Sequence, residues 1–276
     1  MANRVFANHA HVFPASMNPA GTIERLLRLM DACAIDLTVG FAPFPHQCDG
    51  KDVDPNAWLA KEVARQPRLR GFGTIDFRRT DLAAQCRRAR ELGLVGLKLH
   101  PNAQQFDIAS PRAFEVYAAA QEHDLFCTFH SGVHQSRIAE TRVLKFDEVA
   151  WNFPRLRFSM EHVGGYHFFH EALAVLFNHV PPPWEPDKKC NVFGGLASVF
   201  TTHTNRFWHL TDERLRELIA QVGAGQLIFG LDFPYNLERE TQIALDTIRT
   251  RLDLSPADQA KILGGNLARE LDVTLS

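Results

Sequence analysis

The stretch FANHAHVF, residues 6–13, joins an apolar run to two histidines that stand one residue apart. Side chains at positions i and i+2 of a β-strand point to the same face, so His9 and His11 are expected to share one face of the first strand. A doubly wound open sheet normally has a glycine-rich phosphate loop after this strand, and here the histidines stand in its place. The stretch therefore argues against the open sheet, which remains the alternative fold.

Outward from this strand, short β-rich runs alternate with longer amphipathic segments, as in repeated βα units around a parallel sheet. The expected strands lie within residues 4–12, 36–41, 68–77, 94–101, 125–132, 156–165, 191–199 and 226–234. The expected helices include residues 22–33, 81–93, 111–123, 211–223, 239–252 and 255–271, several with Thr, Asp or Ser at the N-cap. Eight such units predict an α/β fold, a (β/α)8 TIM barrel. No linker divides residues 1–276, so a single domain is expected.

The composition is that of an ordinary globular chain, with 45% hydrophobic residues, 22% charged residues and a formal net charge of −2. This charge gives no reason to expect nucleic acid as a partner, and a small-molecule substrate is expected instead. The five cysteines are scattered singly, which argues against a disulfide framework and fits a reducing cytoplasm. No secretory signal or membrane-spanning apolar run is recognised. A homo-oligomer would be ordinary for this fold.

Most of the conspicuous polar side chains fall at the carboxyl ends of the predicted strands, where a barrel has its active-site mouth. They are His9 and His11 on the first strand, Lys98 and His100 on the fourth, His130 on the fifth, His162 on the sixth and Asp232 on the eighth. A single histidine at a strand end is more often a satisfied polar residue than a ligand. The coincidence over five strands is what indicates a metal-centred site.

Imidazole nitrogens and a carboxylate oxygen that meet at one point suit a borderline divalent cation. Zinc is the first expectation, and manganese, iron and cobalt are alternatives. Three histidines and one carboxylate would leave a coordination position for a water molecule, whose pKa the cation lowers. Asp232 is then expected to take the proton of this water, and His162 to polarise the substrate or to act as an acid or base.

Loops beyond the strand ends offer candidates for substrate binding, although a solvated loop is the commoner case. His134 and Arg137 follow the fifth strand and would bind a substrate carboxylate. His203, Arg206 and Trp208 follow the seventh strand and are candidates for a lid or a specificity wall.

Two smaller features have a structural expectation and a functional alternative. Phe41, Phe44 and His46, in the segment at the end of the second strand, are expected to pack locally, and an aromatic edge for a planar ligand is the alternative. Gly164 and Gly165, after His162, are expected to permit a tight turn, and backbone N–H groups offered to an anion are the alternative.

The motifs NHAHVF, GLKLHP, FHSG, EHVGG, GLDFPY and KILGGNLARELDV, in this order, resemble the amidohydrolase superfamily, specifically its amidohydrolase-2 branch of TIM-barrel metal-dependent hydrolases. The resemblance runs from residue 4 to about residue 273. This branch also contains aminocarboxymuconate semialdehyde decarboxylases and related aromatic decarboxylases, pyrone dicarboxylate lactonases and an oxalomesaconate hydratase. Family membership is therefore indicated more strongly than the type of reaction.

Residue by residue, the resemblance implies that His9 and His11 are the metal ligands of the first strand and His130 the ligand of the fifth. Asp232 would be the ligand of the eighth strand and a proton shuttle. His162 occupies the position of a histidine that activates substrate or water in mononuclear relatives and binds a second metal in dinuclear ones.

The fourth strand leaves the number of metal ions open. In dinuclear relatives a lysine at the position of Lys98 is carboxylated and bridges two metals, whereas His100 would face the metal or a substrate carboxylate. The family often has an acidic residue two positions before the first histidine, and Ala7 stands there in this chain. The expected support of His9 by a neighbouring acid is therefore missing from this position.

Three functions remain for the chain. The leading hypothesis is hydrolysis of a small carboxylated lactone, amide or ester by a metal-activated water. The second is nonoxidative decarboxylation of an aromatic or muconate-like acid. The third is a metal-independent binding protein, which would apply if the polar cluster holds no metal.

Overall fold

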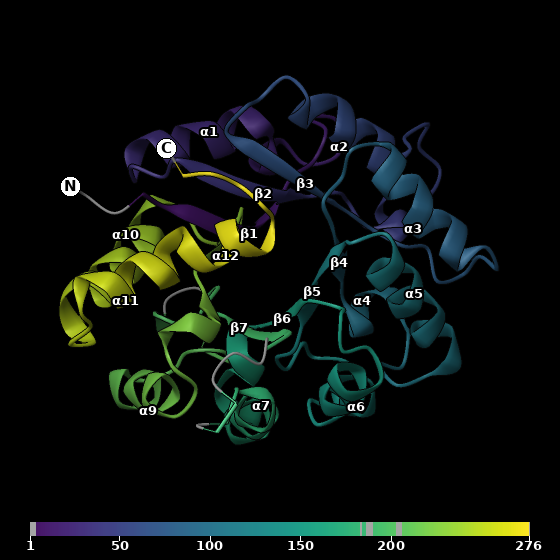
Figure 1. Cartoon of the computed structure of the whole chain (residues 1–276). Helices are drawn as coiled ribbons and strands as arrows, with labels where there is room; N and C mark the ends of the chain where they lie inside the picture. Colours follow the sequence, from purple (N-terminus) through teal and green to yellow (C-terminus); the bar gives the residue numbers. More distant parts are fainter. Residues whose placement is uncertain (1–3, 183, 186–189, 203–205, 276) are drawn as a thin grey trace.

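A parallel β-barrel ringed by helices forms the molecule in the computed structural model, which describes residues 4–182, 184–185, 190–202 and 206–275 (Figure 1). The predicted TIM barrel is thereby confirmed. The strands are β1 (Phe6–His11), β2 (Leu37–Phe41), β3 (Leu69–Gly73), β4 (Gly96–Leu99), β5 (Phe126–His130), β6 (Phe158–Glu161), β7 (Val192–Gly195), β8 (Leu227–Ile228) and β9 (Gly230–Phe233). Each lies within one of the eight expected runs, because β8 and β9 are two parts of the last one.

The barrel closes through this divided last strand. The sheet has the order β8-β7-β6-β5-β4-β3-β2-β1-β9, so its two ends are consecutive in the chain. β8 pairs in parallel with β7, and β9 pairs in parallel with β1. Phe229 lies between the two parts, and its carbonyl oxygen accepts a hydrogen bond from the N–H of Asn8 at 2.8 Å. The eighth run therefore joins the first and seventh strands into a ring.

Helices cover the outside of the barrel. They are α1 (Ile23–Ala32), α2 (Pro55–Val63), α3 (Leu82–Glu91), α4 (Pro101–Gln104), α5 (Pro111–Glu122), α6 (Lys145–Asn152), α7 (Gly165–His179), α9 (Asp212–Val222), α10 (Glu238–Asp246), α11 (Pro256–Ala260) and α12 (Asn266–Glu270). The expected N-caps at Thr22, Ser110 and Thr211 are confirmed, since each side chain accepts a hydrogen bond from a backbone N–H of the first turn. In the described part of the chain, no helix is long and apolar enough to cross a membrane.

The last expected helix, residues 255–271, is instead divided into α11 and α12. Gly264 lies between them and approaches the first strand so closely that a Cβ there would stand 2.7 Å from the backbone nitrogen of Phe6. Only glycine allows this contact, and the helical path bends around it.

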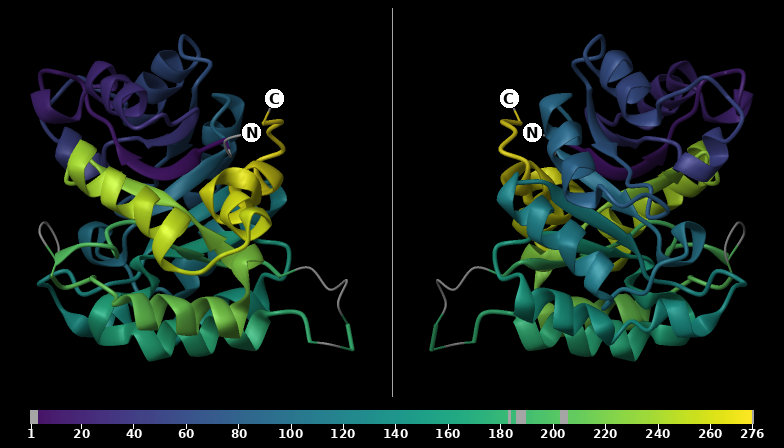
Figure 2. Two further views of the ribbon diagram at one scale, coloured as in Figure 1. Left: turned by 90° about the vertical axis from the view of Figure 1, so that its left-hand side faces the viewer. Right: turned by 90° about the vertical axis from the view of Figure 1, so that its right-hand side faces the viewer.

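Phenylalanine rings fill the lower half of the barrel interior. Phe6, Phe41, Phe72, Phe126 and Phe193, from five different strands, are all fully buried in one apolar cluster. Leu267 of α12 also belongs to this cluster, so the C-terminal helix covers the bottom of the barrel. α12 lies beside β1 at this end of the barrel in Figure 2. The polar strand ends are therefore supported from below by an apolar floor.

A bulge in β1 turns two consecutive polar residues inward. The register of β1 shifts between Ala7 and Ala10 against β2, and between Asn8 and Ala10 against β9. Ala7 and Ala10 pack in the layer between barrel and helices, whereas Asn8 and His9 both make hydrogen bonds inside the barrel. The bulge thus interrupts the alternation between Asn8 and His9, so that both face the interior, and His11 follows on the same side as His9.

Asn266 ties the C-terminal helix to the barrel, and its replacement is expected to destabilise the fold. Its buried Nδ2 donates to the carbonyl oxygens of Ala224 and Leu227 at 2.7 and 2.8 Å. Asn266→Ala removes both buried hydrogen bonds, although the carbonyl oxygen of Ala224 keeps the backbone N–H of Leu227 as a donor. We therefore expect the free energy of unfolding to fall by about 1–3 kcal/mol in urea denaturation. Asn178→Ala, which removes an exposed hydrogen bond to Asp147, is the control and should change it by less than about 0.5 kcal/mol. Equal effects of the two variants would contradict this role of Asn266.

Candidate metal centre

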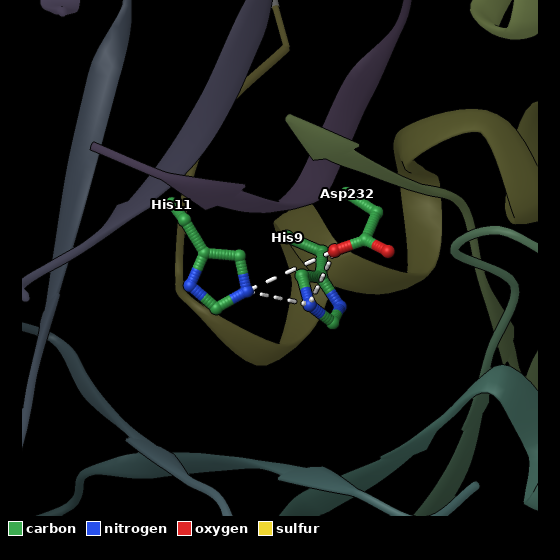
Figure 3. Close-up of side chains that lie close together, drawn as sticks. All are labelled: His9, His11 and Asp232. Atoms are coloured by element: carbon green, nitrogen blue, oxygen red, sulfur yellow. Dashed lines mark hydrogen bonds and ion pairs between the residues drawn. The ribbon is translucent and has the colours of Figure 1, made fainter. Parts of the chain in front are cut away.

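Three predicted ligands meet at the carboxyl ends of β1 and β9. His9 Nε2 lies 3.2 Å from His11 Nε2 and 3.3 Å from Asp232 Oδ1, and His11 Nε2 lies 3.8 Å from the same oxygen (Figure 3). His9 and Asp232 are buried, and His11 is slightly exposed. Figure 3 shows the two rings and the carboxylate turned toward one another. His9 and His11 thus lie on one side of β1, as predicted, and both face Asp232, whereas their role as ligands stays a prediction.

The donor set fits a divalent cation of the expected kind. Two imidazole nitrogens and one carboxylate oxygen, all within 4.8 Å of one another, are a ligand combination that zinc, manganese, iron and cobalt accept. Ligands bound to zinc at about 2.0–2.1 Å in a tetrahedron stand roughly 3.3–3.4 Å apart. The separations of 3.2 and 3.3 Å around His9 Nε2 are close to this value.

The backbone is held in an unusual conformation at three of the strand ends. His9, His162 and Asp232 have φ angles of 69°, 65° and 63°, in the left-handed region that residues other than glycine rarely adopt. Such a conformation costs about 1–3 kcal/mol at each residue and persists only where surrounding contacts maintain it. Its occurrence at three candidate site residues indicates that their positions are fixed by the fold.

Glu161 supports His9 in place of the acid that the sequence lacks at Ala7. Its Oε2 lies 2.8 Å from His9 Nδ1, and both side chains are buried. Burial raises the pKa of Glu161, and the positive charge of Lys98 opposes this shift. The sequence analysis did not identify Glu161, although its place immediately before His162 at the end of a strand was a signal.

Asp232 is oriented by a hydroxyl group on the neighbouring strand end. Ser198 Oγ donates to Asp232 Oδ2 at 2.6 Å and accepts from Asn236 Nδ2 at 2.8 Å. This leaves Oδ1 facing the two histidines. Burial raises the pKa of Asp232 to about 6, against the opposing effect of the Ser198 hydrogen bond. The carboxyl group can therefore take up and release a proton near neutral pH.

His162 lies beside His9, His11 and Asp232, which we call the triad, and its ring has one defined tautomer. Its Nδ1 is 2.8 Å from the carbonyl oxygen of Ala197, which can only accept, so Nδ1 carries the proton. Burial and, after it, the positive charge of Lys98 lower the pKa of His162 to about 3, so the ring is neutral and Nε2 is unprotonated. The ring stacks on Trp208 at a centroid distance of 3.9 Å. His162 therefore presents a hydrogen-bond acceptor in the cavity, and its predicted role in polarising the substrate or as an acid or base stays a prediction.

Lys98 is fully buried beneath the same site. Its Nζ lies 3.4 Å from His9 Nε2 and 5.2 Å from the centroid of the Phe41 ring. Burial lowers its pKa to about 8, whereas the carboxylates of Glu161 and Asp232 raise it. This position next to a ligand of the triad is compatible with the predicted bridging role, which stays a prediction.

His130 and His100 stand beside the triad rather than in it. Their rings stack at a centroid distance of 4.0 Å, and His130 Nε2 is hydrogen-bonded to the carbonyl oxygen of Gly132 at 2.8 Å. His100 Nδ1 accepts the backbone N–H of Ala103 at 3.3 Å, so its proton is on Nε2. The predicted ligand role of His130 therefore stays a prediction.

The three candidate ligands, Lys98 and the neighbouring histidines line one cavity of about 490 Å³. The lining consists of His9, His11, Phe44, His46, Gln47, Lys98, His100, Ala103, His130, His134, His162, Trp208, Asp232 and Tyr235. Phe44 and His46, for which local packing was expected, thus form part of the wall.

The loop residues expected to bind substrate divide into two groups. His134 and Trp208 line the cavity, whereas Arg137 and Arg206 are exposed and are absent from its lining. The Arg206 guanidinium lies over the ring of Phe207 instead. His203 lies outside the described residues.

Two glycines near His162 make room for Trp208. A Cβ at Gly165 would stand 2.8 Å from Trp208 Cδ1, and one at Gly132 would stand 2.5 Å from Trp208 Nε1. The N–H of Gly164 already donates to Ser131 Oγ at 3.0 Å. Gly164 and Gly165 have φ angles of 71° and 65°, so the expected turn is confirmed.

Comparison with known families gives one match over most of the chain. A family model described as amidohydrolase matches residues 9–272. This range includes the three residues of the triad together with Lys98, Glu161 and His162.

Several solved structures share the fold. 5-Carboxyvanillate decarboxylase from Sphingomonas paucimobilis is 19% identical, with coverage of 99% of this chain and 100% of that one and a TM-score of 0.73. A dihydroxybenzoic acid decarboxylase from Polaromonas, with bound manganese, is 17% identical, with coverage of 98% and 97% and a TM-score of 0.70. A candidate 2-pyrone-4,6-dicarboxylic acid hydrolase from Pseudomonas putida is 17% identical, with full coverage of both chains and a TM-score of 0.70. These identities establish similarity of fold alone.

The affinity of the triad for a cation is expected to depend on pH through Asp232. Because the pKa of Asp232 is raised to about 6, lowering the pH through this value places a proton on the carboxylate, and Zn²⁺ affinity should fall. The pKa values of His9 and His11 are well below 6.5, chiefly through burial, so the imidazoles do not compete for protons in this range. Calorimetric titration with Zn²⁺ between about pH 5 and pH 8 measures the effect.

Ser198→Ala provides the control for this assignment. It removes the hydrogen bond that lowers the pKa of Asp232, so the loss of affinity should begin at a higher pH. A Zn²⁺ affinity of the wild-type chain that stays constant down to about pH 5 would contradict the role of Asp232. The same pH dependence of Zn²⁺ affinity in the Ser198→Ala variant and the wild-type chain would also contradict it.

Proposed function

The chain belongs to the amidohydrolase family, and we propose that it is a metal-dependent hydrolase of a small carboxylated lactone, amide or ester. The observation that carries this proposal is the meeting of His9, His11 and Asp232 beside an unprotonated nitrogen of His162. Ligands for a cation and acceptors for a proton then lie in one cavity, as the attack of water on a carbonyl group requires.

The proposed cation is zinc, with manganese, iron and cobalt as alternatives, held by His9, His11 and Asp232 with His130 as a further ligand. When bound, such an ion polarises an oxygen atom of the substrate or of water. Carboxylation of Lys98 and a second ion are the dinuclear variant of this proposal. The neighbour with bound manganese supports a divalent ion in this fold without identifying the ion here.

In the proposed reaction, Asp232 and His162 have different roles toward the attacking water and its proton. Asp232 takes the proton of the attacking water, and the burial of its carboxyl group, which raises its pKa, favours this role. His162 Nε2 accepts a hydrogen bond from the same water and orients it. The water oxygen bonds to the carbonyl carbon, the bond from this carbon to the leaving oxygen or nitrogen breaks, and Asp232 returns the proton to the leaving atom.

The lining of the cavity is the reason for proposing a planar, carboxylated substrate. Phe44, Trp208 and Tyr235 supply aromatic walls, and His100 offers an N–H donor toward the interior. The named substrates of two structural neighbours are 5-carboxyvanillate and dihydroxybenzoic acid, and a third is named for a pyrone dicarboxylate. With Arg137 and Arg206 away from the cavity lining, imidazole and amine donors are the proposed partners of the substrate carboxylate.

Nonoxidative decarboxylation is the second candidate, favoured by the aromatic walls and by the decarboxylases among the structural neighbours. In that reaction the bond between a ring carbon and its carboxylate breaks, carbon dioxide leaves, and the ring carbon takes a proton. Asp232 would be the donor of this proton, because burial favours the protonated form of its carboxyl group. The two candidates use the same side chains and differ in their products.

The nature of the product tests the proposal. We expect the zinc- or manganese-loaded protein to open 2-pyrone-4,6-dicarboxylate with release of one proton per turnover and without carbon dioxide, because water adds across the ester bond. Treatment with a chelator should abolish this activity, and added Zn²⁺ should restore it. Release of carbon dioxide from 2,6-dihydroxybenzoate, with the lactone untouched, would favour the second candidate and refute hydrolysis.

His162→Asn is expected to lower kcat by about 100-fold or more while the bound metal content stays unchanged. Asparagine tolerates the left-handed backbone that His162 adopts at a φ of 65°, so the turn should be retained. His170→Gln, a change of an exposed histidine on α7, is the control and should leave kcat unchanged. Activity of the His162→Asn variant equal to that of the control would exclude His162 from the reaction.

A further inference from the structure

We infer that Glu161 is the positioning residue that orients His9 for cation binding, by holding the ring with a proton on Nδ1 and a free electron pair on Nε2. The inference rests on the cation site of the proposed function but not on the reaction carried out there. It assigns a task to a buried carboxylate that lies outside the triad.

The hydrogen bonds of Glu161 define its charge and the tautomer of His9. Its Oε1 accepts from Asn8 Nδ2 at 3.1 Å and from Ser159 Oγ at 2.7 Å, and its Oε2 lies 2.8 Å from His9 Nδ1. A group surrounded in this way by donors is a carboxylate, so the proton of the contact with His9 belongs to Nδ1. With one proton on a neutral ring, Nε2 keeps its electron pair.

The free electron pair of His9 is directed into the triad. Nε2 lies 3.2 Å from His11 Nε2 and 3.3 Å from Asp232 Oδ1, so the carboxylate of Glu161 stands on the far side of the ring from the cation position. A carboxylate behind a ligating histidine fixes the orientation of the ring and strengthens it as a donor.

The neighbouring strand is shaped to admit this carboxylate. Gly195 of β7 is the backbone partner of Glu161 in the parallel pair β6–β7. A Cβ at Gly195 would stand 2.2 Å from Glu161 Oε1 and 2.5 Å from Oε2, distances that real atoms do not reach. Any side chain at position 195 would therefore displace the carboxylate from His9.

Glu161 also sets the charge around the cation. Lys98 Nζ lies 3.4 Å from His9 Nε2, so a positive charge already stands next to the position of the ion. Glu161 and Asp232 are the buried carboxylates close to it. Without Glu161, one carboxylate would face both the ammonium group and a divalent ion, and binding of the ion would be less favourable.

Glu161→Gln tests the inference with little change of shape. If the amide nitrogen faces His9, it donates to Nδ1 and moves the ring proton to Nε2, where it blocks the cation. If the amide oxygen faces His9, the amide nitrogen meets the donor Asn8 Nδ2. We expect Zn²⁺ affinity, measured by competition with a chelator, to fall by about 10- to 100-fold. The ¹⁵N shifts of His9 in the metal-free protein should show loss of the Nδ1-protonated tautomer.

Gly195→Ala is the second variant, because it displaces Glu161 without removing its charge. It should weaken Zn²⁺ binding to a similar degree, and combining it with Glu161→Gln should add little. Ser159→Ala removes a donor to Oε1 but keeps the contact with His9, so it should change the affinity by less than about threefold.

Two results overturn the inference and are distinguishable. The role of Glu161 alone is refuted if the wild-type chain binds Zn²⁺ and the Glu161→Gln and Gly195→Ala variants bind it equally well with an unchanged His9 tautomer. A wild-type chain that takes up no cation refutes both this role and the proposed function.

Discussion

The burial of three ionisable side chains inside one barrel is the constraint on which the site depends. Lys98, Glu161 and Asp232 have almost no exposed surface, and a phenylalanine floor lies below them. A charge in such surroundings is tolerated only if it is paired and hydrogen-bonded. Each of the three therefore stands close to His9, which is the common neighbour of the ammonium group and of both carboxylates.

Closure of the barrel is what brings these groups together. Lys98 comes from β4, Glu161 from β6 and Asp232 from β9, and His9 and Glu161 are 152 residues apart in the sequence. Parallel strands place their carboxyl ends on the same side, so side chains from all of them can face one axis. The left-handed backbone at His9 and Asp232 then directs the imidazole ring and the carboxylate in a way that a regular strand would not.

The sequence predicted those parts of the site that follow from local patterns. The alternation of the strands placed His9 and His11 on one face, and the order of the motifs placed Asp232 at the mouth. Glu161 was not predicted, because its task requires both a bulge in β1 and the missing side chain of Gly195 on another strand. The place of Glu161 before His162 at a strand end marked it as a candidate, but no local pattern shows its contact with His9, because the two residues are 152 positions apart.

In the loops, too, the sequence indicated the type of residue but not where its side chain lies. Basic character suggested substrate binding by Arg137 and Arg206, but charge in a loop does not specify direction, and both side chains are exposed outside the cavity lining. Phe44 was expected to pack locally and lies in the cavity wall.

Two histidines of the site have the same tautomer but donate their Nδ1–H to different acceptors. His9 donates Nδ1–H to the carboxylate of Glu161, and His162 donates Nδ1–H to the carbonyl oxygen of Ala197. Each therefore presents an unprotonated Nε2. A charged acceptor increases electron donation from the ring, which suits a cation ligand, whereas a neutral carbonyl only fixes its orientation. These two partners agree with the proposed roles, in which His9 binds the cation and His162 orients the water.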